Sequence, residues 1–209
     1  PKIAIFREQG VNGHKEMANA FNLAGFDCYD VNTNDVIANP ALLNEYHGLV
    51  ACGGFSYGDV LGAGRGWANK IKYNHDALNS LSKFFSDKNK FTLGVCNGCQ
   101  MLSNLQSIIP GSEHWPKFIK NNSNQFEARQ VLVKIPKSNS ILFKDMHKSI
   151  LPIIVSHGEG KISIKNKSSI KKAIMQYVDI TGKYTEEYPY NPNGSLNGVT
   201  GFCNNDGRI

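Results

Sequence analysis

The segment Gly94-Val95-Cys96-Asn97-Gly98 places one thiol between two glycines, where an apolar run over 91–95 gives way to helical spacing over 98–104. This order is typical of a nucleophile elbow with cysteine in place of serine. The sharp turn strains the backbone of its central residue, and neighbours without a Cβ tolerate such a turn. The turn also puts Cys96 at a helix N-terminus, where free N–H groups favour the thiolate. We therefore interpret Cys96 as a catalytic nucleophile.

The same residues also spell Cys96-x-x-Cys99, which is found in redox pairs and in halves of zinc sites. A structural zinc site usually has a second close pair of ligands, and Cys28, Cys52 and Cys203 stand apart in the sequence. A redox dithiol also opens a helix after a strand, but it gives no role to the flanking glycines. Both alternatives stay open behind the nucleophile interpretation, and we predict no metal site.

The order of apolar segments predicts an α/β fold. Apolar runs at 2–6, 27–31, 48–52 and 91–95 predict strands, and helical spacing separates them, including a long helix from Trp67 to Phe85. Such alternation predicts a flavodoxin-like, mostly parallel sheet with helices on both faces. Shorter apolar segments at 130–135, 151–156, 161–164 and 173–179 predict a small antiparallel extension. We predict one domain over residues 1–209, because no linker divides the chain.

Composition narrows the class of protein. No apolar run approaches the roughly 18 residues that cross a membrane, and the N-terminal segment lacks the order of a signal peptide. Five irregularly spaced cysteines favour a reducing compartment, so we predict a cytoplasmic protein without a membrane partner. The net charge is +6, and many of the lysines lie between Lys117 and Lys183 among Asn and Ser residues. This pattern predicts a solvated surface and no nucleic-acid partner.

A glycine turn follows the third predicted strand, at Gly53-Gly54-Phe55. Attack of a thiolate on a carboxamide creates a tetrahedral oxyanion, which two backbone N–H groups can stabilise. The N–H of Asn97, next after the nucleophile, is one expected donor. We expect the second donor from Gly54, because glycines let the backbone approach a substrate. A phosphate-binding loop is a weaker alternative, since no Gly-Lys-Ser or Gly-Lys-Thr ending follows.

Further motifs lie on both sides of the elbow. They are Phe6-Arg7-Glu8-Gln9-Gly10-Val11-Asn12, Gly53-Gly54-Phe55-Ser56-Tyr57-Gly58-Asp59, Gly64-Arg65-Gly66-Trp67-Ala68, Ile109-Pro110-Gly111, Gln125-Phe126-Glu127-Ala128-Arg129 and Ser156-His157-Gly158-Glu159-Gly160. Together with the elbow they resemble the class I glutamine amidotransferase domain of phosphoribosylformylglycinamidine synthase, an enzyme of purine biosynthesis. The match spans nearly the whole chain and resembles the long, single-chain form, in which this domain is C-terminal.

The resemblance implies a glutaminase reaction. Cys96 would attack the side-chain amide of L-glutamine to form a glutamyl thioester, with Gly54 and Asn97 as the oxyanion hole. By the same match Gln100 faces the substrate. The pocket wall comes from Gly54, Phe55 and the segment from Asn121 to Phe126, in which Gln125 and Phe126 contact the substrate. His157 and Glu159 border the site.

The ammonia would pass to the formylglycinamide ribonucleotide synthetase domain of the same polypeptide, which uses ATP and magnesium. The resemblance implies no cofactor in the glutaminase domain itself.

In the resembling family the general base and its carboxylate come from a His-Pro-Glu segment that follows Asp-Gly-Arg, and this sequence ends at Asp206-Gly207-Arg208-Ile209. We therefore expect a domain truncated before that segment, with little glutaminase turnover when isolated. His157 is a weaker candidate for the base. The roles of Arg7, Glu8, Asp59 and Arg65 stay open.

A second interpretation also stays open. A flavodoxin-like, cysteine-dependent chaperone or deglycase carries the same elbow, but it has no use for Gln100 or for the Gly54 turn.

Overall fold

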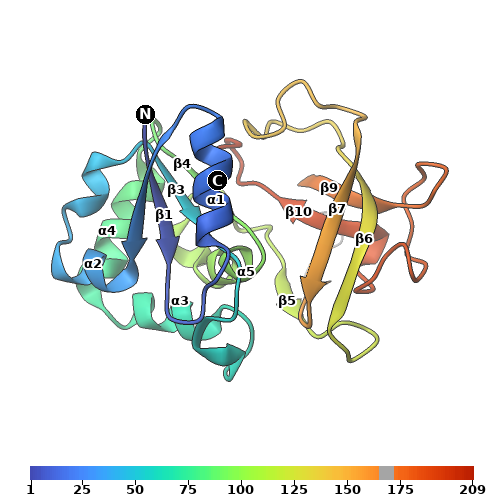
Figure 1. The fold of residues 1–209 in the computed structure, drawn as a ribbon, viewed down its shortest axis with the longest axis horizontal. Helices are drawn as coiled ribbons and strands as arrows, with labels where there is room; N and C mark the ends of the chain where they lie inside the picture. The colour runs from blue at the N-terminus through green and yellow to red at the C-terminus, as the bar shows by residue number, and fades with distance from the viewer. Residues whose placement is uncertain (165–171) are drawn as a thin grey trace. The chain divides into compact units, whose positions relative to one another are not determined.

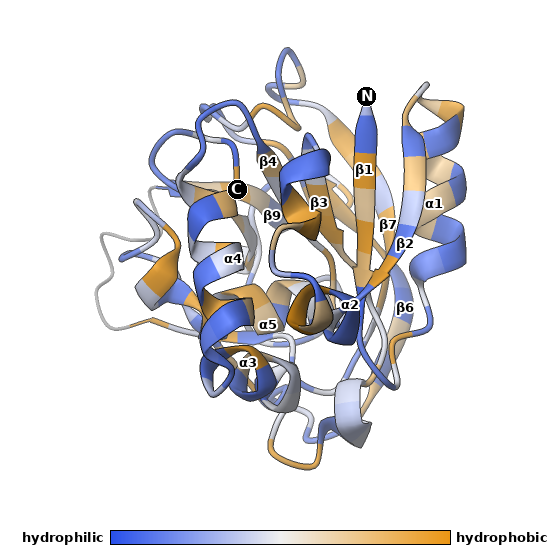
Figure 2. Ribbon diagram, turned by 90° about the vertical axis from the view of Figure 1, so that its left-hand side faces the viewer, coloured by the Kyte–Doolittle hydropathy of each residue, from blue (hydrophilic) through white to orange (hydrophobic). Residues whose placement is uncertain are grey.

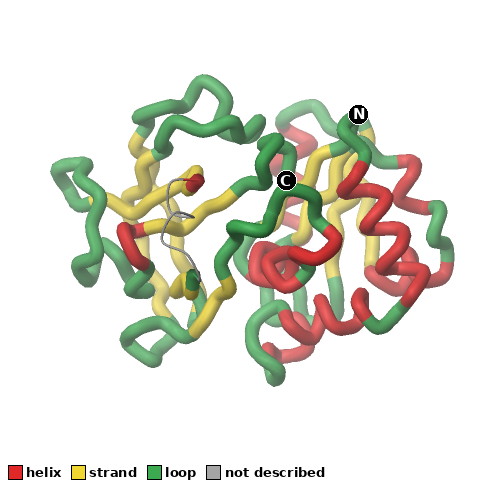
Figure 3. Tube along the Cα trace, turned by 180° about the vertical axis from the view of Figure 1, so that it is seen from behind, coloured by secondary structure: helices red, strands yellow, loops and turns green. Residues whose placement is uncertain are grey.

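The computed structural model describes residues 1–164 and 172–209, which form two compact units. Unit 1 comprises Pro1–Pro110 with Ile209, and unit 2 comprises Gly111–Arg208 (Figure 1). The α-helices of the described residues all belong to unit 1, whereas unit 2 consists of strands, short 3-10 turns and loops (Figure 3). The basic residues at 165, 167 and 171 lie outside the described residues. No helix in the described part of the chain is long and apolar enough to cross a membrane.

Unit 1 contains a four-stranded parallel sheet in the order β2-β1-β3-β4. Its strands are β1 (Lys2–Arg7), β2 (Asp27–Asn32), β3 (Gly48–Ala51) and β4 (Phe91–Gly94). The two central strands, β1 and β3, are the most buried, and Figure 2 shows their apolar residues. All four strands were predicted from the apolar runs, and the predicted α/β class with a mostly parallel sheet is confirmed.

Helices cover both faces of this sheet. They are α1 (His14–Leu23), α2 (Thr33–Ala38), α3 (Arg65–Lys72), α4 (His75–Ser86) and α5 (Asn97–Asn104). The ring of Phe91 in β4 stacks on that of Phe21 in α1, with 6.5 Å between centroids. Gly94 in the same strand faces α5, because an added Cβ there would lie 2.6 Å from Leu102 Cδ1. Since residues three apart in a strand point to opposite faces, α1 and α5 lie on opposite sides.

Helix α3 lies on the same face as α5. The register pairs Phe6 with Ala51 and Ala51 with Gly94, so these three residues share one face of the sheet. The ring of Phe6 contacts that of Trp67 in α3, with 5.3 Å between centroids. Trp67 is fully buried, and its Nε1–H donates to Thr33 Oγ1 at 2.8 Å. The face that carries α5 is therefore closely packed around Trp67.

The predicted long helix from Trp67 to Phe85 is wrong, because the chain breaks it into α3 and α4. Helix α3 ends before Tyr73, and the side chain of Asn74 accepts the N–H of Ala77 at 2.9 Å. This contact is an N-cap, which starts a new helix. The apolar residues keep the same helical spacing before and after the break between α3 and α4. Periodicity alone therefore did not reveal the break.

Unit 2 forms antiparallel sheets of its own, in the orders β10-β9-β6-β7 and β5-β8. The strands are β5 (Lys117–Ile119), β6 (Glu127–Lys134), β7 (Ile150–His157), β8 (Lys161–Ser163), β9 (Ala173–Val178) and β10 (Val199–Phe202). The predicted strands correspond to β6, β7, β8 and β9. The short strands β5 and β10 were not predicted from the apolar segments. Val131, Val133, Val155 and Tyr177 form one buried cluster of this unit.

The close contact between α5 and β3 can be tested at Gly98. An added Cβ at Gly98 would lie 2.1 Å from the carbonyl oxygen of Ala51. We expect Gly98→Ala to lower the free energy of unfolding by about 2 kcal/mol, because overpacking exceeds the gain in helix propensity. Urea unfolding followed by circular dichroism measures this change. As a control, Gly158→Ala meets nothing within 4 Å and should shift stability by less than about 0.5 kcal/mol. Equal stability of the two variants would contradict the contact.

Candidate functional site

Cys96 lies at a sharp turn between β4 and α5, with φ 52° and ψ −114°. An L-residue rarely adopts a positive φ, so the surrounding structure must hold this conformation. The flanking glycines explain how it is held. Gly94 leaves room for α5, where an added Cβ would lie 3.0 Å from the backbone of Cys99, and Gly98 lies against Ala51. The elbow predicted from the sequence is therefore present, and the Cys96 residue is exposed.

All five cysteines are free, so Cys96 and Cys99 form no disulfide. The Cys99 thiol is enclosed within unit 1, and burial raises its pKa to about 12. Such a thiol stays protonated at neutral pH and makes a poor redox partner. No group of three or more His, Cys, Asp or Glu side chains in residues 1–164 and 172–209 is placed to hold a metal ion.

The Gly53-Gly54 peptide has a defined orientation. The Gly53 carbonyl accepts the N–H of Asn12 at 3.1 Å and that of Gly13 at 3.0 Å. In a planar trans peptide the C=O and the following N–H point in opposite directions. The N–H of Gly54 therefore points away from α1. An added Cβ at Gly53 would lie 3.2 Å from Cys96 Cβ, which shows how closely this turn approaches Cys96.

Glycine is required at position 54 itself. Its φ is 145°, and an added Cβ would lie 2.6 Å from Val11 Cα and 2.8 Å from the carbonyl oxygen of Gly10. Val11 and Gly54 also form an isolated antiparallel bridge, and the N–H of Phe55 donates to Gly10 O at 2.9 Å. The 10–13 segment after β1 and the 53–55 turn after β3 are thus joined backbone to backbone.

The orientation of the Asn97 N–H follows from the same reasoning as that of the Gly54 N–H. The Cys96 carbonyl accepts the N–H of Gln100 at 3.0 Å, so the N–H in that peptide points away from the helix. Hydrogen bonds from the N–H groups of Asn97 and Gly54 both favour the Cys96 thiolate. The two expected oxyanion donors therefore converge on the sulfur.

Burial nevertheless dominates the electrostatics of the thiol. Desolvation raises the pKa of Cys96 above its ordinary value, and the charge of Asp59 raises it further. The N–H groups of Asn97 and Gly54 lower the pKa but do not outweigh burial. The sequence led us to expect a favoured thiolate. The structure shows the expected helix N–H contribution but a net shift toward the neutral thiol, because the sulfur is enclosed although the residue as a whole is exposed.

The Asn97 side chain joins the elbow to the glycine-rich loop. It is fully buried, and its Oδ1 accepts the N–H of Ser56 at 3.3 Å. Its Nδ2 donates to Asp59 Oδ1 at 2.9 Å and lies 3.4 Å from Gln100 Oε1. Gln100 is only 6% exposed, so its side-chain oxygen faces Asn97 within unit 1. Phe55 is 45% exposed beside the turn. Unit 1 thus brings together Cys96, Gly54, Asn97 and Gln100, with Phe55 next to them.

A buried ion pair lies beneath the same loop. Glu8 is 2% exposed, and its carboxylate lies 2.9 Å from Lys70 Nζ in α3. Lys70 Nζ lies 6.0 Å from the ring centroid of Tyr57, which has a positive φ of 53°. Of the charged residues whose roles were open in the sequence, Arg7, Glu8 and Asp59 thus have partners in unit 1. Arg7 likewise binds Asp30 through two hydrogen bonds of 2.6 and 2.8 Å.

The remaining predicted residues lie in unit 2 and gather around Asn121. This buried side chain donates to the carbonyls of Gln125 at 3.0 Å and His157 at 2.7 Å, and it accepts the N–H of Gly160 at 3.0 Å. It therefore ties the segment that holds Gln125 and Phe126 to the turn that holds Glu159. Phe126 is half exposed. The resemblance puts Asn121 at the start of a pocket-wall segment, but the sequence did not indicate its hydrogen bonds, which join segments distant in the chain.

His157 has a carboxylate neighbour that the sequence did not indicate. The β6–β7 register pairs His157 with Glu127, which is 4% exposed and accepts a hydrogen bond from Arg129. Burial lowers the pKa of His157, and the charge of Glu127 opposes that effect. Its ring lies against Gly160, where an added Cβ would come within 2.2 Å of His157 Cε1. His157 is therefore a packed, mainly neutral imidazole near pH 7.

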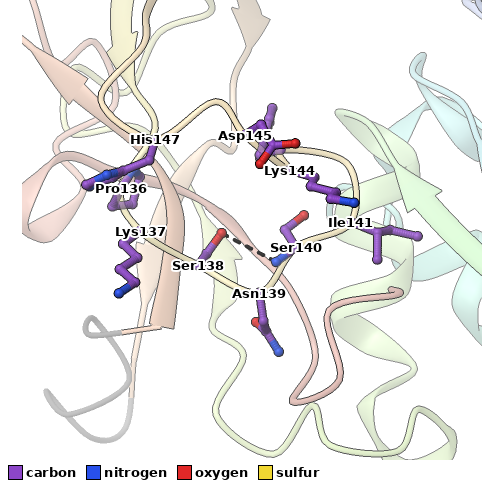
Figure 4. Close-up of a pocket in the computed structure, with 10 residues that line it drawn as sticks. Pro136, Lys137, Ser138, Asn139, Ser140, Ile141, Lys144, Asp145 and His147 are labelled. Atoms are coloured by element: carbon purple, nitrogen blue, oxygen red, sulfur yellow. Dashed lines mark hydrogen bonds between the residues drawn. The ribbon is translucent and has the colours of Figure 1, made fainter.

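Two cavities of unit 2 are lined by residues other than those predicted for the site. One of about 270 Å³ is lined by the segment from Pro136 to His147, including Lys137 and Lys144 (Figure 4). The other, of about 420 Å³, shares the 137–139 segment and adds Lys172 and Cys203 among its lining residues. Among the described residues, none that the sequence predicted for the site lines either cavity.

Comparison with known proteins places this geometry in context. A family model described as a CobB/CobQ-like glutamine amidotransferase domain matches residues 1–209. A chain in the structure of PurLQS from Thermotoga maritima is 22% identical, with a TM-score of 0.73, and the match covers 100% of this chain and 84% of that one. A putative GMP synthase subunit from Thermoplasma acidophilum is 19% identical, with a TM-score of 0.48 over 77% of this chain and 66% of that one. The PurLQS match shows the fold.

The raised pKa of Cys96 can be tested by alkylation. The thiolate is the reactive form, so a raised pKa moves the rise in alkylation rate to higher pH. We expect the midpoint for Cys96 with iodoacetamide to exceed that of a model cysteine peptide, and Cys99 to stay unmodified below about pH 9, since its pKa is about 12. Peptide mapping by mass spectrometry at several pH values measures both rates. A midpoint below that of the model peptide would refute the dominance of burial.

The Glu8–Lys70 pair can be tested on one helix. Lys70→Met leaves Glu8 buried without its partner, and we expect a loss of about 3 kcal/mol in the free energy of unfolding. The matched control is Lys72→Met in the same helix, where the side chain is exposed and the change should stay within about 0.5 kcal/mol. Urea unfolding compares the two. Equal free energies of unfolding for the two variants would contradict a stabilising role for the Glu8–Lys70 ion pair.

Proposed function

Because this chain belongs to the CobB/CobQ-like glutamine amidotransferase family, we propose that it is the glutaminase part of phosphoribosylformylglycinamidine synthase. The motifs around Cys96, Gly54 and His157 support this choice within the family. The likeness of fold to the PurLQS chain over the whole length supports the same assignment. The finding that carries the proposal is the elbow at Cys96, with two backbone N–H groups directed at its sulfur.

The first step of the proposed reaction uses the geometry of unit 1. The Cys96 thiolate attacks the carboxamide carbon of L-glutamine, a C–S bond forms, and the carbonyl oxygen takes up the negative charge. The N–H groups of Gly54 and Asn97 would bind that oxygen once the thiolate has reacted. Removing one such donor typically costs about a hundredfold to a thousandfold in kcat, because the donors are already oriented.

The second step releases ammonia. The C–N bond breaks, the nitrogen leaves as ammonia after taking up a proton, and a glutamyl thioester remains on Cys96. Water then hydrolyses the thioester to glutamate and restores the thiol. Because the resting thiol of Cys96 is mainly protonated, the reaction needs a general base. The resemblance assigns that role to a His-Pro-Glu segment and leaves His157 and Glu159 at the border of the site.

The same proposal assigns the remaining contacts. Gln125, Phe126 and Phe55 would contact the substrate. Gln100 would lie on the substrate side of the elbow helix and hold the Asn97 side chain through their contact. The ammonia would go to the synthetase domain of the same polypeptide, where ATP and magnesium bind. We propose no cofactor for this chain and a cytoplasmic location, which its five free cysteines support. The family match favours this function over the chaperone or deglycase interpretation.

Labelling with a glutamine-mimicking diazo-ketone tests the proposed function. We expect this electrophile to modify Cys96 alone among the five cysteines, and L-glutamine to slow the reaction in proportion to site occupancy. Peptide mapping locates the label, and Cys96→Ser serves as the unlabelled control. L-glutamine should protect Cys96 from iodoacetamide to a similar extent, because protection depends on occupancy of the site and not on the reagent. Labelling that L-glutamine does not slow would rule out a glutamine site at Cys96.

A further inference from the structure

We propose that the side chains of Asn97 and Asp59 form a positioning bridge that fixes the two oxyanion donors relative to each other. This inference rests on the proposed glutaminase function. Asn97 would then contribute twice, through its backbone N–H as a donor and through its side chain as a support. Asp59 would act through Asn97 and touch no reacting atom, so it is a positioning residue.

The contacts of Asn97 carry the inference. Its side chain is fully buried, and both of its polar atoms bind the loop that follows Gly54. Oδ1 accepts the N–H of Ser56, and Nδ2 donates to Asp59 Oδ1 at 2.9 Å. The two donors come from different strand ends, so the sequence alone does not set their separation. The bridge joins those strand ends next to the sulfur, where it can set that separation.

The backbone of the loop points to the same role. Tyr57, Gly58 and Asp59 have φ values of 53°, 63° and 53°, so three consecutive residues are left-handed. This conformation is unfavourable for Tyr57 and Asp59, which carry a Cβ. It persists only where surrounding contacts hold it, and such residues concentrate at functional sites. Here it turns the Asp59 carboxylate back toward the buried amide of Asn97.

The charge of Asp59 is not the useful property for the nucleophile. A carboxylate near Cys96 disfavours the thiolate and raises the pKa of that thiol. The hydrogen bond to Asn97, in contrast, needs only an acceptor oxygen. The two effects are therefore separable, because Asp59→Asn removes the charge but keeps an oxygen that can accept from Asn97.

Glutaminase kinetics of the complete enzyme that contains this chain test the bridge. We expect Asp59→Ala to lower kcat by about 10-fold to 100-fold, with KM changed by less than about threefold, because a small displacement of a preorganised group has effects of this size. Asp59→Asn should recover most of that loss. In both variants the midpoint of Cys96 alkylation should move to lower pH, because the charge is gone. Glu16→Ala, an exposed acidic residue in α1, is the matched control and should change neither quantity.

Exchanging the two residues provides an independent variant. Asn97→Asp opposes two carboxylates and should lower kcat as Asp59→Ala does. The double variant Asn97→Asp with Asp59→Asn restores one donor and one acceptor, and we expect it to recover most of the kcat lost in Asn97→Asp. This test does not require Asp59→Ala to fold. Two substitutions that each merely destabilised the protein would lower kcat further together and would not restore it.

The results separate failure of the bridge from failure of the function. Full kcat in Asp59→Ala, an equal loss in Asp59→Asn and Asp59→Ala, or no recovery in the exchanged double variant would each overturn the bridge. If the unmodified enzyme shows no glutamine-protected labelling of Cys96, the glutaminase function itself fails.

Discussion

Two hydrogen bonds to the Gly53 carbonyl, from the N–H groups of Asn12 and Gly13, determine what this site can do. They fix the plane of one peptide and so aim the N–H of Gly54 at the Cys96 sulfur. The arrangement requires the chain after β1 to lie against the chain after β3, backbone to backbone. A side chain at position 54 would collide with Val11, so glycine there is a consequence of the hydrogen bonds.

The parallel sheet explains why the second donor lies nearby. Strands β3 and β4 are neighbours, with Ala51 paired to Gly94, so their carboxyl ends deliver the Gly54 turn and the Cys96 elbow side by side. Ligand sites of parallel sheets collect at these strand ends for the same reason. The close packing of Gly98 on Ala51 then sets the depth of α5 against the sheet, and with it the position of the Asn97 N–H.

Much of unit 1 could be predicted from the sequence, because its signals are local. Apolar runs gave the four parallel strands, and the glycines around Cys96 gave the elbow. The Asn97 side-chain contacts, the left-handed Asp59 and the hydrogen bonds of Asn121 in unit 2 could not be predicted in this way. They depend on hydrogen bonds between segments far apart in the chain. The direction of the Cys96 pKa was also misjudged, because desolvation depends on how the surrounding elements pack.

A crystal structure of the chain with a glutamine-derived aldehyde bound covalently to Cys96 would test the central claim most directly. The oxygen of that adduct occupies the position of the oxyanion. Our account predicts that it lies about 2.7–3.1 Å from both the Gly54 and the Asn97 backbone nitrogens. An adduct oxygen that points into solvent, or that reaches only one of the two nitrogens, would contradict it.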